Sequence, residues 1–227
     1  MCGIEKVWLK AAGEVRQDVP PRNEADRALI IFIKNPILGK IKTRLAATLG
    51  DHAALDAYGE MTAHVRTVAS GVECHRAVFY SDFIDNQDKW SSPAFAKYLQ
   101  VPTGLGERML AAFQAMFAEG FQKVAIVGSD FLDLQAQHLE QAFRALSFHD
   151  FVIGPTDDGG YYLLGMKVLE PSVFLNKRWS TSSVFMSTMD DIRDAGKLVF
   201  VLPEISDIDD AAAWDAARAR REKRSGK

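Results

Sequence analysis

Apolar residues follow two different spacings along most of the chain. Short continuous apolar runs, typical of strands buried on both faces, alternate with longer segments in which apolar residues recur every three or four positions, as on one face of a helix. The expected strands are residues 28–33, 75–80, 98–101, 124–127, 151–153, 161–166 and 198–202. The expected helices are residues 51–70, 107–119, 135–146 and 183–195.

This alternation predicts the fold class. Strands separated by helices need crossover connections, which favour a mostly parallel sheet with helices on both faces, a three-layer α/β/α sandwich. We expect one domain over residues 27–220, preceded by an N-terminal extension (residues 1–26) and followed by a basic C-terminal tail (residues 221–227). Ligands of such sheets bind beyond the carboxyl ends of the strands. Polar residues that directly follow a predicted strand are therefore the candidates for function.

Composition narrows the class of protein. The chain has 227 residues, of which 48% are hydrophobic, enough for a core. The formal net charge of −3 disfavours a nucleic-acid partner. No apolar run approaches the roughly 18 residues of a membrane span, and the N-terminus lacks the order of a signal peptide. Because Cys2 and Cys74 are the only cysteines, a disulfide framework is excluded and a cytoplasmic location is expected. The oligomeric state stays open.

The first polar segment, residues 34–45, directly follows the first predicted strand and leads into a helix. Backbone N–H groups at a helix start, together with Lys and Arg side chains, suit a diphosphate. Hydrogen bonds to charged groups contribute about 1.5–3 kcal/mol each, against about 0.3–1 kcal/mol for the helix dipole. The side-chain cations should therefore supply most of the affinity. The segment is not a Walker A loop, because Gly39-Lys40 is followed by Ile41. Its cations are Lys34, Lys40, Lys42 and Arg44.

Two further segments are shorter. Gly104, Gly106 and Arg108 stand at a predicted helix start, although the third glycine of a dinucleotide fingerprint is missing. Asp130 ends the segment Gly-Ser-Asp after the most apolar strand, where a carboxylate can bind a divalent cation that holds phosphate oxygens. A plain turn residue is the alternative for Asp130.

Acidic residues mark the last two segments. In the block of residues 154–162, the adjacent carboxylates Asp157 and Asp158 repel each other unless donors or a cation compensate, and the following glycines allow close approach of a ligand. An Asp-Gly hairpin turn is the alternative reading. The other segment follows the last predicted strand, and one of its aspartates is expected to cap the next helix. These aspartates are Asp207, Asp209 and Asp210.

The order of these motifs resembles one bacterial family. The motifs are Lys-x-Pro-x-x-Gly-x-x-Lys-Thr-Arg-Leu, Gly-x-Gly-x-Arg-Met, Gly-Ser-Asp, Gly-Pro-x-x-Asp-Gly-Gly-Tyr-Tyr-Leu, Trp-Ser-Thr and Asp-x-Asp. They resemble those of small cytoplasmic proteins classed as glycosyltransferases of the GT-A, or nucleotide-diphospho-sugar transferase, fold, some of them linked with arsenosugar biosynthesis. The resemblance covers residues 28–218. The chain departs from the family pattern at Phe131-Leu132, where a small residue and Pro are usual, and at Asp210-Ala211, where Thr-Pro usually follows the Asp-x-Asp motif.

The resemblance implies roles for individual residues. The implied diphosphate ligands are Lys34, Gly39, Lys42, Thr43 and Arg44, and the residues beside the nucleotide are Gly104, Gly106 and Arg108. The implied metal ligand is Asp130, with Asp209 or Asp207 as the second carboxylate. Asp158 is the implied general base. The implied sugar or acceptor side comprises Asp157, Gly159, Gly160 and Tyr161, with Trp179 and Thr181 closing over it.

These roles define the expected activity. We expect a metal-dependent glycosyltransferase that uses Mg²⁺ or Mn²⁺, binds a nucleotide sugar and transfers the sugar to a small-molecule acceptor. The chain also resembles, more distantly, nucleotidyltransferases of the same fold, which join a nucleoside triphosphate to a phosphorylated small molecule. A non-catalytic nucleotide-binding module is the third hypothesis.

Overall fold

The computed structural model describes residues 26–90 and 93–224, and within them seven strands form one sheet. The strands are β1 (Arg27–Ile33), β2 (His75–Tyr80), β3 (Ala96–Leu99), β4 (Lys123–Gly128), β5 (Phe151–Pro155), β6 (Tyr161–Met166) and β7 (Val199–Val201). Their order in the sheet is β3-β2-β1-β4-β6-β5-β7. Strand β6 runs antiparallel to β4 and β5, and the other pairs are parallel. The predicted mostly parallel sheet is confirmed.

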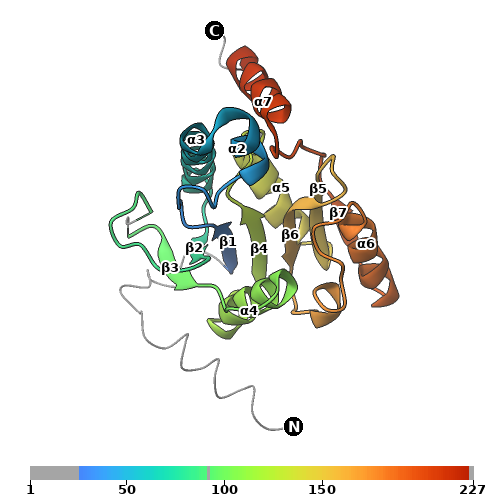
Figure 1. Ribbon diagram of the computed structural model, residues 1–227. Helices are drawn as coiled ribbons and strands as arrows, with labels where there is room; N and C mark the ends of the chain where they lie inside the picture. The colour runs from blue at the N-terminus through green and yellow to red at the C-terminus, as the bar shows by residue number, and fades with distance from the viewer. Residues whose placement is uncertain (1–25, 91–92, 225–227) are drawn as a thin grey trace.

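Helices cover both faces of this sheet, which gives the three predicted layers (Figure 1). Helices α3 and α5 pack on one face, whereas α4, α6 and the 3₁₀ helix η1 pack on the other. The helices are α2 (Thr43–Leu49), α3 (Asp51–Ser70), α4 (Leu105–Ala118), α5 (Ala136–Ala145), α6 (Val184–Asp194), α7 (Ala211–Arg224) and η1 (Pro171–Val173). Among the described residues, no helix is both long and apolar enough to cross a membrane.

The central strands are continuously apolar because both of their faces are buried. In β1, Leu29 and Ile31 point into the core under α3 and α5, and Ala28 and Ile30 point into the core under α4 and α6. The predicted strand at 98–101 lies instead at Ala96–Leu99. Strand β3 is at the sheet edge and only partly buried, so its hydrophobic pattern is weak.

A third core lies beyond the carboxyl end of the sheet, between α2, α3 and α7. Three of its members belong to loops rather than helices: Ile41, Leu132 and Ile208. Each lies within two residues of a predicted site residue, namely Lys42, Asp130 or Asp209. This third core therefore fixes the loops that carry the predicted site. Its other buried members are Leu45, Ala54, Ala57, Tyr58, Met61, Trp214 and Ala217.

Helix α7 is tied to the rest of the domain by two ion pairs. Arg220 donates from Nε to Oδ2 of Asp133 at 2.9 Å, and its Nη2 lies 2.7 Å from the same carboxylate oxygen as an ion pair. Arg221 Nη1 lies 2.6 Å from Oε1 of Glu60 on α3. Thus α7 runs through the predicted boundary at residue 221. Of the predicted N-terminal extension, residues 1–25 lie outside the described residues, and Asp26 pairs with Lys123 at 3.0 Å.

Replacement of Trp214 by alanine is expected to lower the free energy of unfolding by about 3–5 kcal/mol. The reason is that the Trp214 side chain is only 6% exposed and fills the third core. Urea denaturation measures the change. Phe148→Ala is the control, because Phe148 is 77% exposed and its loss should change stability by less than about 0.5 kcal/mol. Equal, small effects of the two variants would show that α7 is not part of the core.

Candidate functional site

Two adjoining cavities lie at the carboxyl ends of the parallel strands. The larger has a volume of about 590 Å³ and the smaller about 190 Å³. Both are lined by Lys34, Lys40, Ile41, Tyr58 and Asp130. Of the other predicted site residues, the larger cavity is lined by Arg108, Asp158, Gly160, Tyr161, Trp179 and Thr181. Those that line the smaller cavity are Lys42, Thr43, Arg44 and Asp209. Motifs far apart in the sequence thus meet at one place.

The loop from β1 to α2 presents its cations to the smaller cavity. Its end is anchored by the buried side chains of Ile41 and Leu45. Lys42, between these two, has left-handed backbone angles (φ 44°, ψ 53°) directly before α2 begins at Thr43. Gly39 makes the earlier turn at φ 76°, a conformation that glycine adopts without strain. Gly39 therefore shapes the loop, while the side chains of its neighbours line the cavity.

Lys42 lies between two carboxylates. Its side chain is only 9% exposed, and its Nζ is 2.7 Å from Asp130 Oδ2 and 3.5 Å from Asp209 Oδ1. Arg44, 79% exposed, donates from Nη1 to Asp209 Oδ2 at 2.9 Å. The predicted metal ligands and diphosphate ligands thus form one network.

The charged groups around Lys42 shift the pKa values of their neighbours. Burial alone would lower the pKa of Lys42, but the carboxylates of Asp130, Asp207 and Asp209 raise it above its ordinary value. Burial, opposed by the Lys42 ammonium group, raises the pKa of Asp207 to about 6, and the neighbouring carboxylates add to the rise. Lys42 is therefore a permanent positive charge inside an acidic cluster.

Tyr58 joins the ends of β1 and β4. This buried residue of α3 accepts a hydrogen bond from the Lys34 backbone N–H (2.9 Å), and its hydroxyl lies 3.0 Å from Lys34 O and 2.9 Å from Ser129 Oγ. Burial raises the pKa of Tyr58 to about 12, so the hydroxyl stays protonated. Sequence reasoning missed this role, because Tyr58 occupies an ordinary apolar position of the helical stripe. A buried tyrosine needs a partner for its hydroxyl, which is the signal that could have revealed it.

Replacing Tyr58 by phenylalanine is expected to cost about 1–3 kcal/mol of folding free energy, because buried polar groups of Lys34 and Ser129 lose their partner. Denaturation in urea reports the loss. Tyr98→Phe serves as the control, since Tyr98 bonds at 2.9 Å to the partly exposed Glu119, which can turn to water instead. A Tyr58→Phe variant as stable as the control would contradict the assigned role.

Polar side chains gather where β1, β2 and β3 end. Asn35 ties β1 to the loop after β2, because its Nδ2 donates to Phe83 O (2.9 Å) and its Oδ1 accepts from Asp82 N (2.9 Å). Gln100 donates from Nε2 to Phe79 O (2.8 Å) and to Ile33 O (3.3 Å). Both Gln100 and Asp82 line the larger cavity. Sequence reasoning did not single out any of these residues.

The start of α4 has a structural role beside this end of the cavity. Gly104 is the N-cap of α4, and its N–H donates to Glu107 Oε2 at 3.3 Å. Arg108 donates from Nε to Thr103 O at 2.7 Å and lines the larger cavity. At Gly106 a Cβ atom would lie 2.3 Å from Phe174 O and 2.6 Å from Trp179 Nε1. Gly106 is therefore a close-packing position, and of the three predicted residues only Arg108 lines the cavity.

The loop between β5 and β6 holds Asp158 at the cavity wall. Asp158 Oδ1 accepts from Thr156 Oγ1 (2.6 Å) and Gly160 N (2.9 Å), as in a tight turn. Gly159 has φ 85°, and a Cβ there would lie 2.1 Å from Ser182 O. Asp157 lines neither cavity; its Oδ1 accepts from Asp207 N at 3.0 Å. The block is therefore a turn, and it places Asp158 at the wall of the larger cavity.

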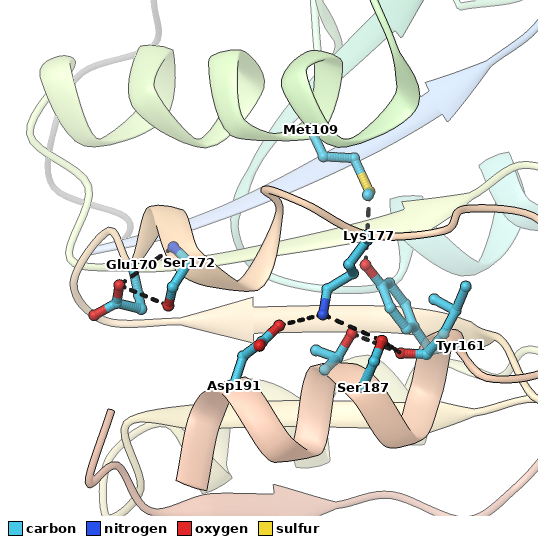
Figure 2. Close-up of polar contacts among 9 residues, drawn as sticks. Met109, Tyr161, Glu170, Ser172, Lys177, Ser187 and Asp191 are labelled. Atoms are coloured by element: carbon cyan, nitrogen blue, oxygen red, sulfur yellow. Dashed lines mark hydrogen bonds and ion pairs between the residues drawn. The ribbon is translucent and has the colours of Figure 1, made fainter. Parts of the chain in front are cut away.

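Two aromatic side chains, Tyr161 and Trp179, also line the larger cavity. The rings of Tyr161 and Trp179 meet edge to face with centroids 6.4 Å apart, and the Tyr161 hydroxyl contacts Met109 Sδ at 3.9 Å. Figure 2 shows this Tyr161–Met109 contact together with the anchor of the neighbouring loop. There Lys177 pairs with Asp191 of α6 and donates to Ser187 Oγ at 3.4 Å. The loop that carries Trp179 is thus fastened to α6.

The carboxylates at the smaller cavity supply few ligands for a metal ion. Within residues 26–90 and 93–224, no group of three or more His, Cys, Asp or Glu side chains could hold a metal ion. Asp130 and Asp209, however, both approach one cation, the Lys42 ammonium group. Mg²⁺ is commonly held by one or two carboxylates completed by substrate phosphate oxygens and water. The pair fits a cation that arrives with phosphates, and it does not form a complete protein site. Asp210 instead caps α7, accepting from Ala213 N at 2.9 Å, as predicted for one aspartate.

Known proteins were compared with this chain. A search of the curated proteins gave no match. The structure of a "putative nucleotide-diphospho-sugar transferase" from Desulfovibrio desulfuricans G20 is 30% identical, with a TM-score of 0.77, over 82% of this chain and 83% of that one. Two other structures share the fold at low identity. One is 4-diphosphocytidyl-2C-methyl-D-erythritol synthase from Anaerococcus prevotii (13% identity, TM-score 0.55, 86% and 95% covered). The other is glucosyl-3-phosphoglycerate synthase from Mycobacterium tuberculosis, solved with Mn²⁺, UDP and glucosyl-3-phosphoglycerate (10% identity, TM-score 0.51, 90% and 81% covered).

A protein-family model described as "Uncharacterized protein conserved in bacteria (DUF2064)" matches residues 64–181, about half of the chain. The 30% identical structure covers 82% of the chain and therefore includes most of its fold. The seven-stranded sheet of this chain is the mostly parallel sheet that was predicted. The chain belongs to this bacterial family, DUF2064, and has the nucleotide-diphospho-sugar transferase (GT-A) fold.

Proposed function

We propose that this protein is a metal-dependent glycosyltransferase, which binds a nucleoside diphosphate sugar and transfers the sugar to a small acceptor. One observation carries the proposal: a loop rich in cations and the carboxylates Asp130 and Asp209 converge on the same small cavity. A diphosphate together with a divalent cation matches both sets of charges.

The nucleoside diphosphate sugar, which is the donor substrate, would extend across both cavities. The diphosphate would lie in the smaller cavity, against Lys34, Lys42, Thr43 and Arg44. The nucleoside would lie over the ends of β1 to β3, beside Gln100 and Arg108, because ligands of such sheets bind beyond the carboxyl ends of the strands and these polar side chains line the larger cavity there. The sugar would then extend toward the two aromatic side chains that line the larger cavity.

Asp130 and Asp209 would hold the cation, Mg²⁺ or Mn²⁺. When bound, it supplies Lewis-acid stabilisation of the charge that develops on the departing diphosphate. Lys42 and Arg44 would stabilise the same negative charge through hydrogen bonds already positioned in the protein. The similar synthase from M. tuberculosis, solved with Mn²⁺ and UDP, is consistent with this proposal.

Asp158 would take the proton from the acceptor hydroxyl. Hydrogen bonds from Thr156 and Gly160 hold its Oδ1, which leaves Oδ2 to accept from the acceptor. A positioned base of this kind contributes about 10²–10⁴-fold to a rate. Tyr161 and Trp179 would exclude water from the sugar.

A nucleotidyltransferase is the second candidate. The specific observation in its favour is that four cations, Lys34, Lys40, Lys42 and Arg44, line the smaller cavity, which would also suit a triphosphate. In that reaction a sugar phosphate would attack the nucleotide and release pyrophosphate.

Product analysis by phosphorus NMR distinguishes the two reactions. In one series the protein would be incubated with Mn²⁺ and nucleotide sugars, with water as the acceptor of the sugar. In the other it would be incubated with Mn²⁺, nucleoside triphosphates and sugar phosphates. Release of a nucleoside diphosphate in the first series supports the glycosyltransferase. Release of pyrophosphate in the second supports the alternative. If the protein binds nucleotide but turns over in neither series, the result favours the third hypothesis, a non-catalytic nucleotide-binding module.

A further inference from the structure

The ammonium group of Lys42 occupies the place of a cation between Asp130 and Asp209. Its Nζ contacts Oδ2 of Asp130 at 2.7 Å and approaches Oδ1 of Asp209 to 3.5 Å. Asp209 also receives the hydrogen bond from Arg44 at 2.9 Å. Both carboxylates are therefore already neutralised by side chains of the protein itself.

The chain holds Lys42 in this position. Ile41 and Leu45, on either side of Lys42 in the sequence, are buried in the third core. Lys42 itself adopts the left-handed backbone conformation, which residues other than glycine rarely adopt. Strained backbone of this kind persists where the surrounding structure enforces it, and it clusters at functional sites. The left-handed turn and the burial of the side chain together direct the ammonium group toward the acidic pair.

A divalent cation and the ammonium group cannot both occupy this position. Two cations at contact distance repel strongly in a partly buried site, where screening by water is weak. The described residues also offer no third His, Cys, Asp or Glu side chain to complete a metal site. A metal ion that approached the protein alone would have to displace Lys42 and would gain only two protein ligands.

A bound diphosphate would remove both obstacles to metal binding, namely the position of Lys42 and the lack of further ligands. Its oxygens are strong acceptors for the Lys42 ammonium group, and they lie within reach if the diphosphate occupies the smaller cavity, which Lys42 also lines. The same oxygens supply further ligands for a divalent cation.

We infer that Lys42 closes the Asp130–Asp209 pair to divalent cations in the nucleotide-free protein, so that the metal binds only together with a nucleoside diphosphate. The inference rests on the proposed function for the identity of the ligand that opens the pair. The exclusion of the free cation does not rest on the proposed function, because it follows from the contacts of Lys42 with Asp130 and Asp209.

The test is binding of Mn²⁺ alone, followed by the electron paramagnetic resonance signal of the free ion. Wild-type protein is expected to bind Mn²⁺ only weakly. The variant Lys42→Met, which leaves both carboxylates in place without their cation, is expected to bind Mn²⁺ at least about tenfold more tightly. Lys40→Met is the matched control: it also removes one cation from the smaller cavity, but Lys40 makes no ion pair among the described residues. It should bind Mn²⁺ as the wild type does.

Two further variants keep the test decisive. Lys42→Gly removes the same charge and accommodates the left-handed backbone, so it should fold even if Lys42→Met does not. Lys42→Met combined with Asp130→Asn should lose the newly gained Mn²⁺ affinity, which would place the ion at this pair.

Equal Mn²⁺ affinities of the wild type and both Lys42 variants would overturn the inference, as would an equal gain in Lys40→Met. In a second arm, a series of nucleoside diphosphates is added to the wild type, and one of them should raise its Mn²⁺ affinity. If none binds, the proposed function fails, while the comparison with Mn²⁺ alone still decides whether Lys42 excludes the cation.

Discussion

Replacement of Asp130 by alanine is expected to abolish the Mn²⁺-dependent part of nucleotide binding while the fold survives. Asp130 lies at the end of β4, lines both cavities and makes the closer contact with Lys42, at 2.7 Å. Without it, Asp209 is the only carboxylate left of the pair that we propose for the metal. Calorimetric titration of a nucleoside diphosphate with and without Mn²⁺ should give the same affinity for the variant. Turnover should fall by at least about 10²-fold, because charge on the leaving diphosphate loses its main stabilisation.

The control for Asp130→Ala is Asp56→Ala. Asp56 is an exposed carboxylate of α3 that lines neither cavity, so its loss makes the same change in net charge without touching the site. A variant of Asp130 that keeps a Mn²⁺-dependent gain in nucleotide affinity would refute the assignment of this residue.

Asp158→Asn is expected to lower turnover by about 10²–10⁴-fold with little change in nucleotide affinity. The amide oxygen can still accept the hydrogen bonds from Thr156 and Gly160, so the turn should persist. An amide, however, does not accept a proton from the acceptor hydroxyl. Steady-state kinetics with a saturating donor isolates the effect on the chemical step.

Asp157→Asn is the matched control for this variant. Asp157 is adjacent in sequence and lies outside both cavities, and as an asparagine it can still accept from Asp207 N. Its turnover should stay near that of the wild type. If Asp157→Asn were the slower variant of the two, the general base would have to be sought elsewhere.

The fold could be predicted from the sequence because the strands are distinct. Leu29 and Ile31 on one face of β1, and Ala28 and Ile30 on the other, make an unbroken apolar run, which is typical of a strand buried on both faces. The antiparallel direction of β6 does not follow from its hydrophobic pattern, because Tyr161 to Met166 has the same buried pattern as a parallel strand. The short connection between Pro155 and Tyr161 indicates it instead, because a parallel pair needs a crossover of about a dozen residues or more. Strand direction depends on the connection, not on the hydrophobic pattern.

The sequence indicated which loops form the site but not how they contact each other. Arg44 and Asp209 are 165 residues apart, so their hydrogen bond depends on the packing of the third core. Asp157 and Asp158 are chemically identical and adjacent, yet only Asp158 lines a cavity. Gln100 was missed for a similar reason: a single glutamine in a weakly patterned edge region carries no motif. Tertiary contacts decide each of these roles.

The most direct measurement is a thermal-shift screen of nucleoside mono-, di- and triphosphates and nucleotide sugars, each with and without Mn²⁺. A ligand at about one hundred times its dissociation constant adds roughly 2.7 kcal/mol of stability, which gives a clear shift. The proposed function predicts a Mn²⁺-dependent shift from one nucleoside diphosphate and from its sugar conjugate. The absence of a shift with every nucleotide, in the presence and absence of Mn²⁺, would contradict it.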